Sequence, residues 1–157
     1  MSEVFEGIVV SQRLSEIEAD NLLDASLVRD SIGDQASVFY RSDNRSDLEF
    51  SIEIEDIARS VAEQLGSAVV VRYDSRLGHR SSVVFRKDTS PQRYDPVDEL
   101  FVPLDESGEP MAEVEPLRFE ELEESAEYET STNAIELGLR AIDGPTWHDL
   151  RSFIAAH

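Results

Sequence analysis

The chain has 157 residues, 40% of them hydrophobic, and a formal net charge of −20 at pH 7. It contains no cysteine and no long apolar run, which excludes disulfides, thiolate metal sites, a cysteine nucleophile and a membrane-spanning helix. The strong negative charge favours solubility and disfavours direct binding to nucleic acid or to an anionic membrane. A chain of this length is expected to form a single domain, over residues 1–157.

The first residues predict a strand followed by a helix. Residues 4–10 are rich in β-branched and aromatic side chains, which favour a strand. Ser15 is placed to cap a helix over residues 15–26, with Glu16 and Glu18 in its first turn, where negative charge is favourable. The N-terminus carries neither the basic segment nor the apolar run of a secretory signal, so we expect a cytoplasmic protein.

A hairpin and a helix are predicted next. Gly33–Asp34 indicates a turn, and residues 36–41 read as a strand. LEFSIEIE at 48–55 alternates apolar and polar residues with period two, which predicts a second strand and a hairpin between the two. Residues 56–65 predict a helix that ends at Gly66, because glycine readily adopts the left-handed conformation needed there.

Two further strands are predicted at 69–73 and 82–86, joined by a loop over 74–81. The composition then changes: residues 89–130 form a Pro-rich acidic segment, which we expect to form loops or strands at the edge of the sheet. Within it, LFVPLDESGEPMAEV predicts an edge hairpin, because Pro103 cannot donate a ladder hydrogen bond in a central strand.

The chain is predicted to end in two helices. Residues 133–142 carry one apolar stripe, and Gly144–Pro145 ends that helix. Thr146 is placed to cap the last helix, with Asp149 three residues later in a capping-box arrangement. Together the elements predict the α+β class: a mostly antiparallel sheet of five or six strands, helices on one face, and a C-terminal helical pair.

The stretch VRYDSRLGHRSSVVFRKD at 71–88 gathers positive charge in an acidic chain. Two interpretations stay open for it. Its strand arginines, Arg72 and Arg86, would be outward neighbours that pair with acids elsewhere in the chain, either Glu49 and Glu53 or the acidic segment 94–129 folding back. Alternatively, the stretch binds an external anion or an acidic surface of another protein, since arginine holds carboxylate or phosphate bidentately. The candidate anion-binding residues are Arg72, Arg76, His79, Arg80 and Arg86.

Residues 94–129 hold 14 acidic residues and one arginine, a net charge of −13. Apolar and aromatic side chains are interleaved with the acids, which suits a protein-binding surface better than a plain polyanion. A solvated flank, or the surface of a protein from a salt-adapted cell, would have the same composition. The candidate partner-binding residues are Phe119, Glu120, Glu121, Glu123, Glu124 and Tyr128.

No motif assigns an enzymatic activity. The chain has neither a Gly-rich nucleotide-binding loop nor a spaced metal-ligand motif, so we expect no cofactor and no dedicated metal site. We therefore expect a non-enzymatic interaction module of the immunity, chaperone or inhibitor type, which binds a protein partner through its acidic surface. The alternatives are a small-ligand or enzymatic anion pocket at 72–86, and a structural assembly subunit without a ligand. The pattern leaves the oligomeric state open.

Overall fold

The computed structural model describes residues 4–15, 18, 27–40, 53–75, 79–95, 100–105, 109–110, 117–118 and 134–156. Within these ranges, the side chains of a few strand and helix-end residues stay outside the description: Glu53, His79, Asp95, Leu100, Leu117 and Arg118.

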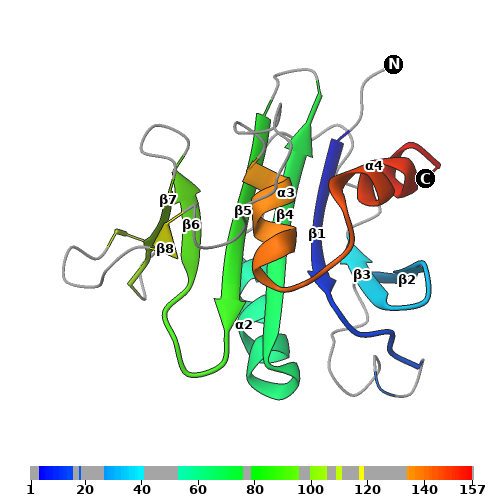
Figure 1. The fold of residues 1–157 in the computed structure, drawn as a ribbon. Coiled ribbons are helices and arrows are strands. Elements are labelled where there is room, and N and C mark those ends of the chain that lie inside the picture. The colour runs from blue at the N-terminus through cyan, green and yellow to red at the C-terminus, as the bar shows by residue number, and fades with distance from the viewer. Residues whose placement is uncertain are drawn as a thin grey trace.

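The described residues form one antiparallel sheet with strand order β2-β3-β1-β4-β5-β6-β7-β8 (Figure 1). The strands are β1 (Val4–Val10), β2 (Val28–Ile32), β3 (Ala36–Tyr40), β4 (Ser67–Asp74), β5 (His79–Arg86), β6 (Gln92–Asp95), β7 (Leu100–Pro103) and β8 (Leu117–Arg118). The helices are α2 (Glu53–Leu65), α3 (Ala134–Ala141) and α4 (Trp147–Ala156). The α+β class, the antiparallel sheet and the C-terminal helices are confirmed, with eight strands in the described residues instead of five or six.

Helices cover both faces of the sheet, where the sequence predicted one face. Helix α2 packs its Ile54, Ala58 and Val61 against alternate residues of β1, β4 and β5 on one face. Helices α3 and α4 pack against the intervening residues of the same strands on the other face. The central strands are therefore buried on both sides, which explains why β4 reads as the almost continuous apolar run SAVVV.

Helix α2 starts earlier than predicted, at Glu53, so residues 53–55 of LEFSIEIE form its first turn. The prediction of a strand over these three residues was wrong, because Ile54 belongs to the helical series that continues with Ala58 and Val61 rather than to an alternating strand. Residues 48–52 lie outside the described residues. Gly66 ends the helix as predicted: its φ is 104°, and its N–H donates to the carbonyl of Ala62 at 2.8 Å.

Strand β2 was not predicted, because VRDSI is short and only partly apolar. It forms a hairpin with β3 across the predicted turn, where Gly33 has a φ of 64°. The predicted hairpin of residues 36–41 with 48–55 falls largely outside the described residues. Ser15 and Glu18 exchange hydrogen bonds of 3.2 Å in a capping box, in line with the predicted cap, and most of the helix expected at 15–26 also lies outside them.

The C-terminal helices are fixed by polar contacts as well as by their apolar faces. The hydroxyl of Ser82 on β5 donates to the carbonyl of Ala134 at 2.7 Å, at the start of α3. The predicted cap of α4 is confirmed, since Thr146 Oγ1 accepts the N–H of Asp149 at 3.1 Å. The carboxylate of Glu136 on α3 accepts the N–H of Trp147 at 2.5 Å, which joins the first turn of α4 to α3.

The Pro-rich segment contributes three short strands to one side of the sheet. The predicted hairpin after β7 is visible as an antiparallel bridge between Leu104 and Pro110, with the N–H of Asp105 donating to the carbonyl of Glu109 at 2.8 Å. Strand β7 is not itself at the edge, because its first two residues pair with β8. Pro103 opposes Gln92 of β6 and lies beyond the two residues of β7 that pair with β8. On the β8 side, its missing N–H therefore removes no ladder hydrogen bond.

Candidate functional site

The basic stretch forms a β-hairpin of β4 and β5, in register from the Ser67–Arg86 pair to the Asp74–His79 pair. Two strands and a tip were predicted for this stretch. Arg76 and the side chain of His79 lie outside the description, so the anion site predicted from these residues stays a prediction. The three remaining candidates, Arg72, Arg80 and Arg86, have defined surroundings.

Arg72 lies on the α2 face and is held between two carboxylates. Its Nε lies 3.1 Å from Oε2 of Glu6 on β1, and its Nη2 lies 2.8 Å from Oε2 of Glu55 on α2. The side chains of Arg72 and Glu6 are 10% and 1% exposed, so this cluster is desolvated. An internal acidic partner was predicted for Arg72, and the structure identifies Glu6 and Glu55 in that role. A buried cluster of this kind positions β1, β4 and α2 relative to one another.

Arg86 lies on the opposite face, against the last turn of α3. Its Nη2 donates to the carbonyl oxygen of Ala141 at 2.7 Å, where the partial negative charge of a helix C-terminus favours a cation. In the sheet, Arg86 opposes Ser67 and Arg72 opposes Ser81. The prediction that Arg72 and Arg86 are outward neighbours was therefore wrong. Arg72 lies on the face of the sheet that α2 covers, whereas Arg86 lies on the face that α3 covers.

Arg80 is exposed and lies over two aromatic rings. Its Cζ is 5.8 Å from the ring centroid of Tyr73 and 5.7 Å from that of Trp147, within the range of cation–π attraction. No carboxylate in the described part of the chain forms an ion pair with it. Arg72, Arg80 and Arg86 therefore occupy three different environments on two faces of the sheet, and the structure does not bring them together in one pocket.

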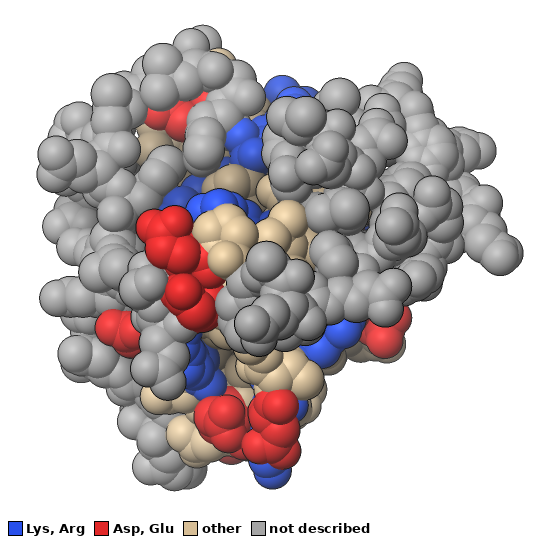
Figure 2. Space-filling model, turned by 90° about the vertical axis from the view of Figure 1, so that its left-hand side faces the viewer, with Lys and Arg blue, Asp and Glu red and all other residues tan. Residues whose placement is uncertain are grey.

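The candidate partner-binding residues lie outside the described residues, from Phe119 to Tyr128. Figure 2 shows the molecule from the side of β6 and β7, where the described acidic side chains are interspersed with basic residues and with uncharged ones. On this face the described charges of both signs are mixed rather than separated into two patches.

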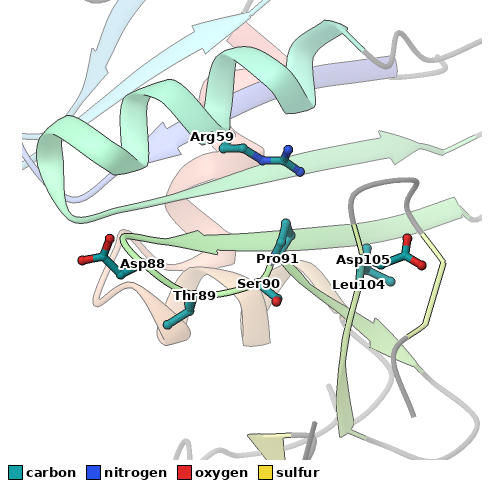
Figure 3. Close-up of a pocket in the computed structure, with 7 residues that line it drawn as sticks. All are labelled: Arg59, Asp88, Thr89, Ser90, Pro91, Leu104 and Asp105. Carbon is teal, nitrogen blue, oxygen red and sulfur yellow. The ribbon is translucent and has the colours of Figure 1, made fainter. Parts of the chain in front are cut away.

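A cleft that the sequence did not indicate lies between α2, the β5–β6 turn and the segment that follows β7 (Figure 3). Its volume is about 410 Å³, within the range of small-ligand sites. It is lined by Arg59 from α2, by Asp88, Thr89, Ser90 and Pro91 from the turn, and by Leu104 and Asp105 after β7. These residues come from three separated segments of the chain, so no local sequence motif predicts the site.

Backbone hydrogen bonds hold the walls of this cleft. The N–H of Leu104 donates to the carbonyl of Pro91 at 2.7 Å, and the N–H of Lys87 donates to that of Gly66 at 3.0 Å. The first bond joins two walls, and the second ties the β5–β6 turn to the end of α2. Asp88 has a φ of 62°, a left-handed conformation that aspartate tolerates better than most side chains. The cleft is therefore preformed by the fold.

In the part of the chain that the structure describes, no group of three histidine, aspartate or glutamate side chains is arranged to hold a metal ion. None of the helices there combines the length and the apolarity that a membrane crossing requires. No protein-family model matches the chain, and no curated protein or solved structure matches it either.

Proposed function

We propose that the protein is a small acidic cytoplasmic interaction module, of the immunity, chaperone or inhibitor type, that binds a basic protein partner through its acidic surface. The observation that carries this proposal is how the basic hairpin is used. Arg72 is matched by Glu6 and Glu55, and Arg86 binds a helix carbonyl. Arg80 lies over two rings, and no described carboxylate pairs with it.

The consequence concerns the charge of residues 94–129, which is −13. The hairpin is the most basic part of the chain, and it was the natural internal counterpart for this segment. With Arg72 and Arg86 bound to other groups within the fold, a basic surface on another protein is the better electrostatic complement. Such complementarity accelerates association at low ionic strength and weakens as salt screens it.

Salt-titrated co-purification from the cells that make the protein tests the proposal. We expect basic proteins to be retained at about 50 mM salt and released at about 500 mM, because the Debye length shortens over that range and the attraction between opposite charges is screened. A variant with Glu120, Glu121, Glu123 and Glu124 changed to glutamine should lose these proteins.

A control variant carries the same change in net charge at exposed acids elsewhere: Asp34→Asn, Asp56→Asn, Glu63→Gln and Asp143→Asn. It should retain the partner. Equal loss in both variants, or no retained protein at any salt concentration, would refute a specific acidic surface.

A second candidate function is anion binding at the tip of the β4–β5 hairpin, favoured by the exposure of Arg80 and its lack of a described acidic partner. Inorganic phosphate or malonate should then raise the melting temperature. Arg76→Ala combined with Arg80→Ala should abolish that increase while leaving the melting temperature without ligand nearly unchanged. An increase that survives in this variant would place the anion elsewhere.

A further inference from the structure

The cleft between α2 and the β5–β6 turn carries an arginine without an acidic partner in a chain where acids outnumber bases by 34 to 14. Arg59 is exposed on α2, and none of the described carboxylates forms an ion pair with it. Figure 3 shows its side chain extending from the helix over Pro91 and into the cleft. A guanidinium that extends into a cleft in this way offers a planar pair of donors to a carboxylate or a phosphate.

The other charges of the cleft select between these two anions. Asp88 and Asp105 also line it, so the described lining carries two negative charges against one positive charge. In Figure 3, Asp105 lies on the side toward which Arg59 extends, whereas Asp88 lies at the other end and directs its carboxylate away. A phosphate dianion would meet repulsion from these aspartates and from the net charge of −20. A ligand that also carries a cationic group would meet Asp105.

Asp105 is positioned by its own loop. Its Oδ1 accepts the N–H of Glu109 at 3.0 Å, and its N–H donates to the carbonyl of Glu109 at 2.8 Å. A carboxylate has about four lone-pair directions, so accepting this bond does not by itself prevent it from pairing with an ammonium group. Pro91 and the buried Leu104 supply the apolar part of the lining.

We propose that this cleft binds a small zwitterion that carries a carboxylate and an ammonium group, namely a free amino acid or a short peptide. Arg59 pairs with the carboxylate, Asp105 pairs with the ammonium group, and an apolar side chain of the ligand contacts Pro91 and Leu104. The volume of about 410 Å³ accommodates a ligand of dipeptide size. This function is independent of the acidic surface proposed above, and either can fail without the other.

Calorimetric titration of the full chain with leucine and with alanylleucine tests the proposal. At least one of them should bind, with leucine alone indicating an amino-acid site and alanylleucine alone a peptide site. For the ligand that binds, acetylation of its amino group or amidation of its carboxylate should each weaken binding about tenfold or more, because each removes one charge-assisted contact. Inorganic phosphate should not compete.

Variants of the two charged residues locate the site. Arg59→Gln and Asp105→Asn should each weaken binding about tenfold. Arg59 is exposed on its helix, and an asparagine at 105 keeps the acceptor for Glu109, so circular dichroism and melting should show both variants folded. Arg93→Gln, which changes an exposed arginine outside the cleft, should bind normally.

Three results would overturn the proposal. Neither zwitterion binds at millimolar concentration, a blocked ligand or phosphate binds as tightly as the free ligand, or Arg59→Gln and Asp105→Asn leave the affinity unchanged. Loss of partner retention in the glutamine variant of residues 120–124 would have no bearing on these titrations.

Discussion

Ser82 of β5 and Gly138 of α3 mark a point where a helix lies directly on the sheet. A Cβ atom added at Gly138 would come within 2.6 Å of the Cβ of Ser82 and 3.1 Å of a methyl group of Val69. Atoms cannot approach this closely, so a side chain at 138 would push α3 away from the strands. The contact also aligns Ser82 with the carbonyl of Ala134, one turn earlier in the helix.

Gly138→Ala should therefore destabilise the protein by about 1–3 kcal/mol, the usual cost of overpacking a well-packed interior. The sign is informative, because alanine at an unconstrained helix position stabilises relative to glycine by about 0.5–1 kcal/mol. Urea unfolding followed by circular dichroism measures the difference. A stabilised Gly138→Ala variant would show that α3 does not lie this close to β5.

The buried cluster around Arg72 gives a larger effect. Arg72→Met should cost about 3–5 kcal/mol, because it leaves the carboxylate of Glu6 buried beside an apolar side chain. Adding Glu6→Gln should recover part of this loss, since the second change removes the uncompensated charge. The exposed Arg13–Asp34 pair, with side chains 57% and 95% exposed, is the matched control.

Arg13→Met should change stability by no more than about 0.5 kcal/mol. If Arg72→Met behaved like Arg13→Met in the same unfolding experiment, the interpretation of Glu6 and Arg72 as a desolvated pair would be wrong.

Glu136 connects the two C-terminal helices and can be tested with the single tryptophan of the chain as a probe. Glu136→Ala removes the acceptor of the Trp147 N–H and the i,i+4 partner of Arg140. We expect a loss of about 1–2 kcal/mol, the range found for groups that satisfy a helix N-terminus. Fluorescence of Trp147 should show the unfolding transition of the variant at a lower denaturant concentration than that of the natural chain.

Ser152→Ala, at an exposed position of the same helix, is the control for this measurement and should leave the midpoint almost unchanged. Identical midpoints for Glu136→Ala and the natural chain would mean that α4 does not depend on this carboxylate.

Salt should stabilise the isolated protein. A net charge of −20 produces repulsion that opposes the compact state, and added ions screen it. The melting temperature should rise when sodium chloride is increased from about 10 mM to about 500 mM, over which the Debye length shortens severalfold. The glutamine variant of Glu120, Glu121, Glu123 and Glu124 should show a smaller rise. A melting temperature that falls with salt would indicate that specific ion pairs outweigh general repulsion.

Much of the fold could be predicted where the signal is local. The β4–β5 hairpin follows from two β-rich runs around a polar tip. The end of α2 at Gly66 follows from the conformational freedom of glycine, and the start of α4 after Thr146 follows from capping. The first turn of α2 was misassigned, because Ile54 fits both an alternating and a helical apolar series. Only packing against the sheet distinguishes the two.

The rest depends on which segments return to the sheet. Ser82, Val84 and Arg86 have the alternation of a solvated strand face, yet α3 comes from far along the chain and covers it. The sequence indicated an internal partner for Arg72 without identifying Glu6, which pairs with it across β1 and β4. The cleft could not be predicted at all, because α2, the β5–β6 turn and Leu104 meet only after the sheet has formed.

The position of β1 has a consequence for synthesis on the ribosome. It precedes every other described strand in chain order, yet it lies between β3 and β4, and Val4 pairs with Asp74. The apolar strand VFEGIVV therefore leaves the exit tunnel long before its second neighbour exists, with one hydrogen-bonding edge open. During that interval the unpaired backbone groups of that edge stay exposed, and the centre of the sheet cannot close before β4 has been translated.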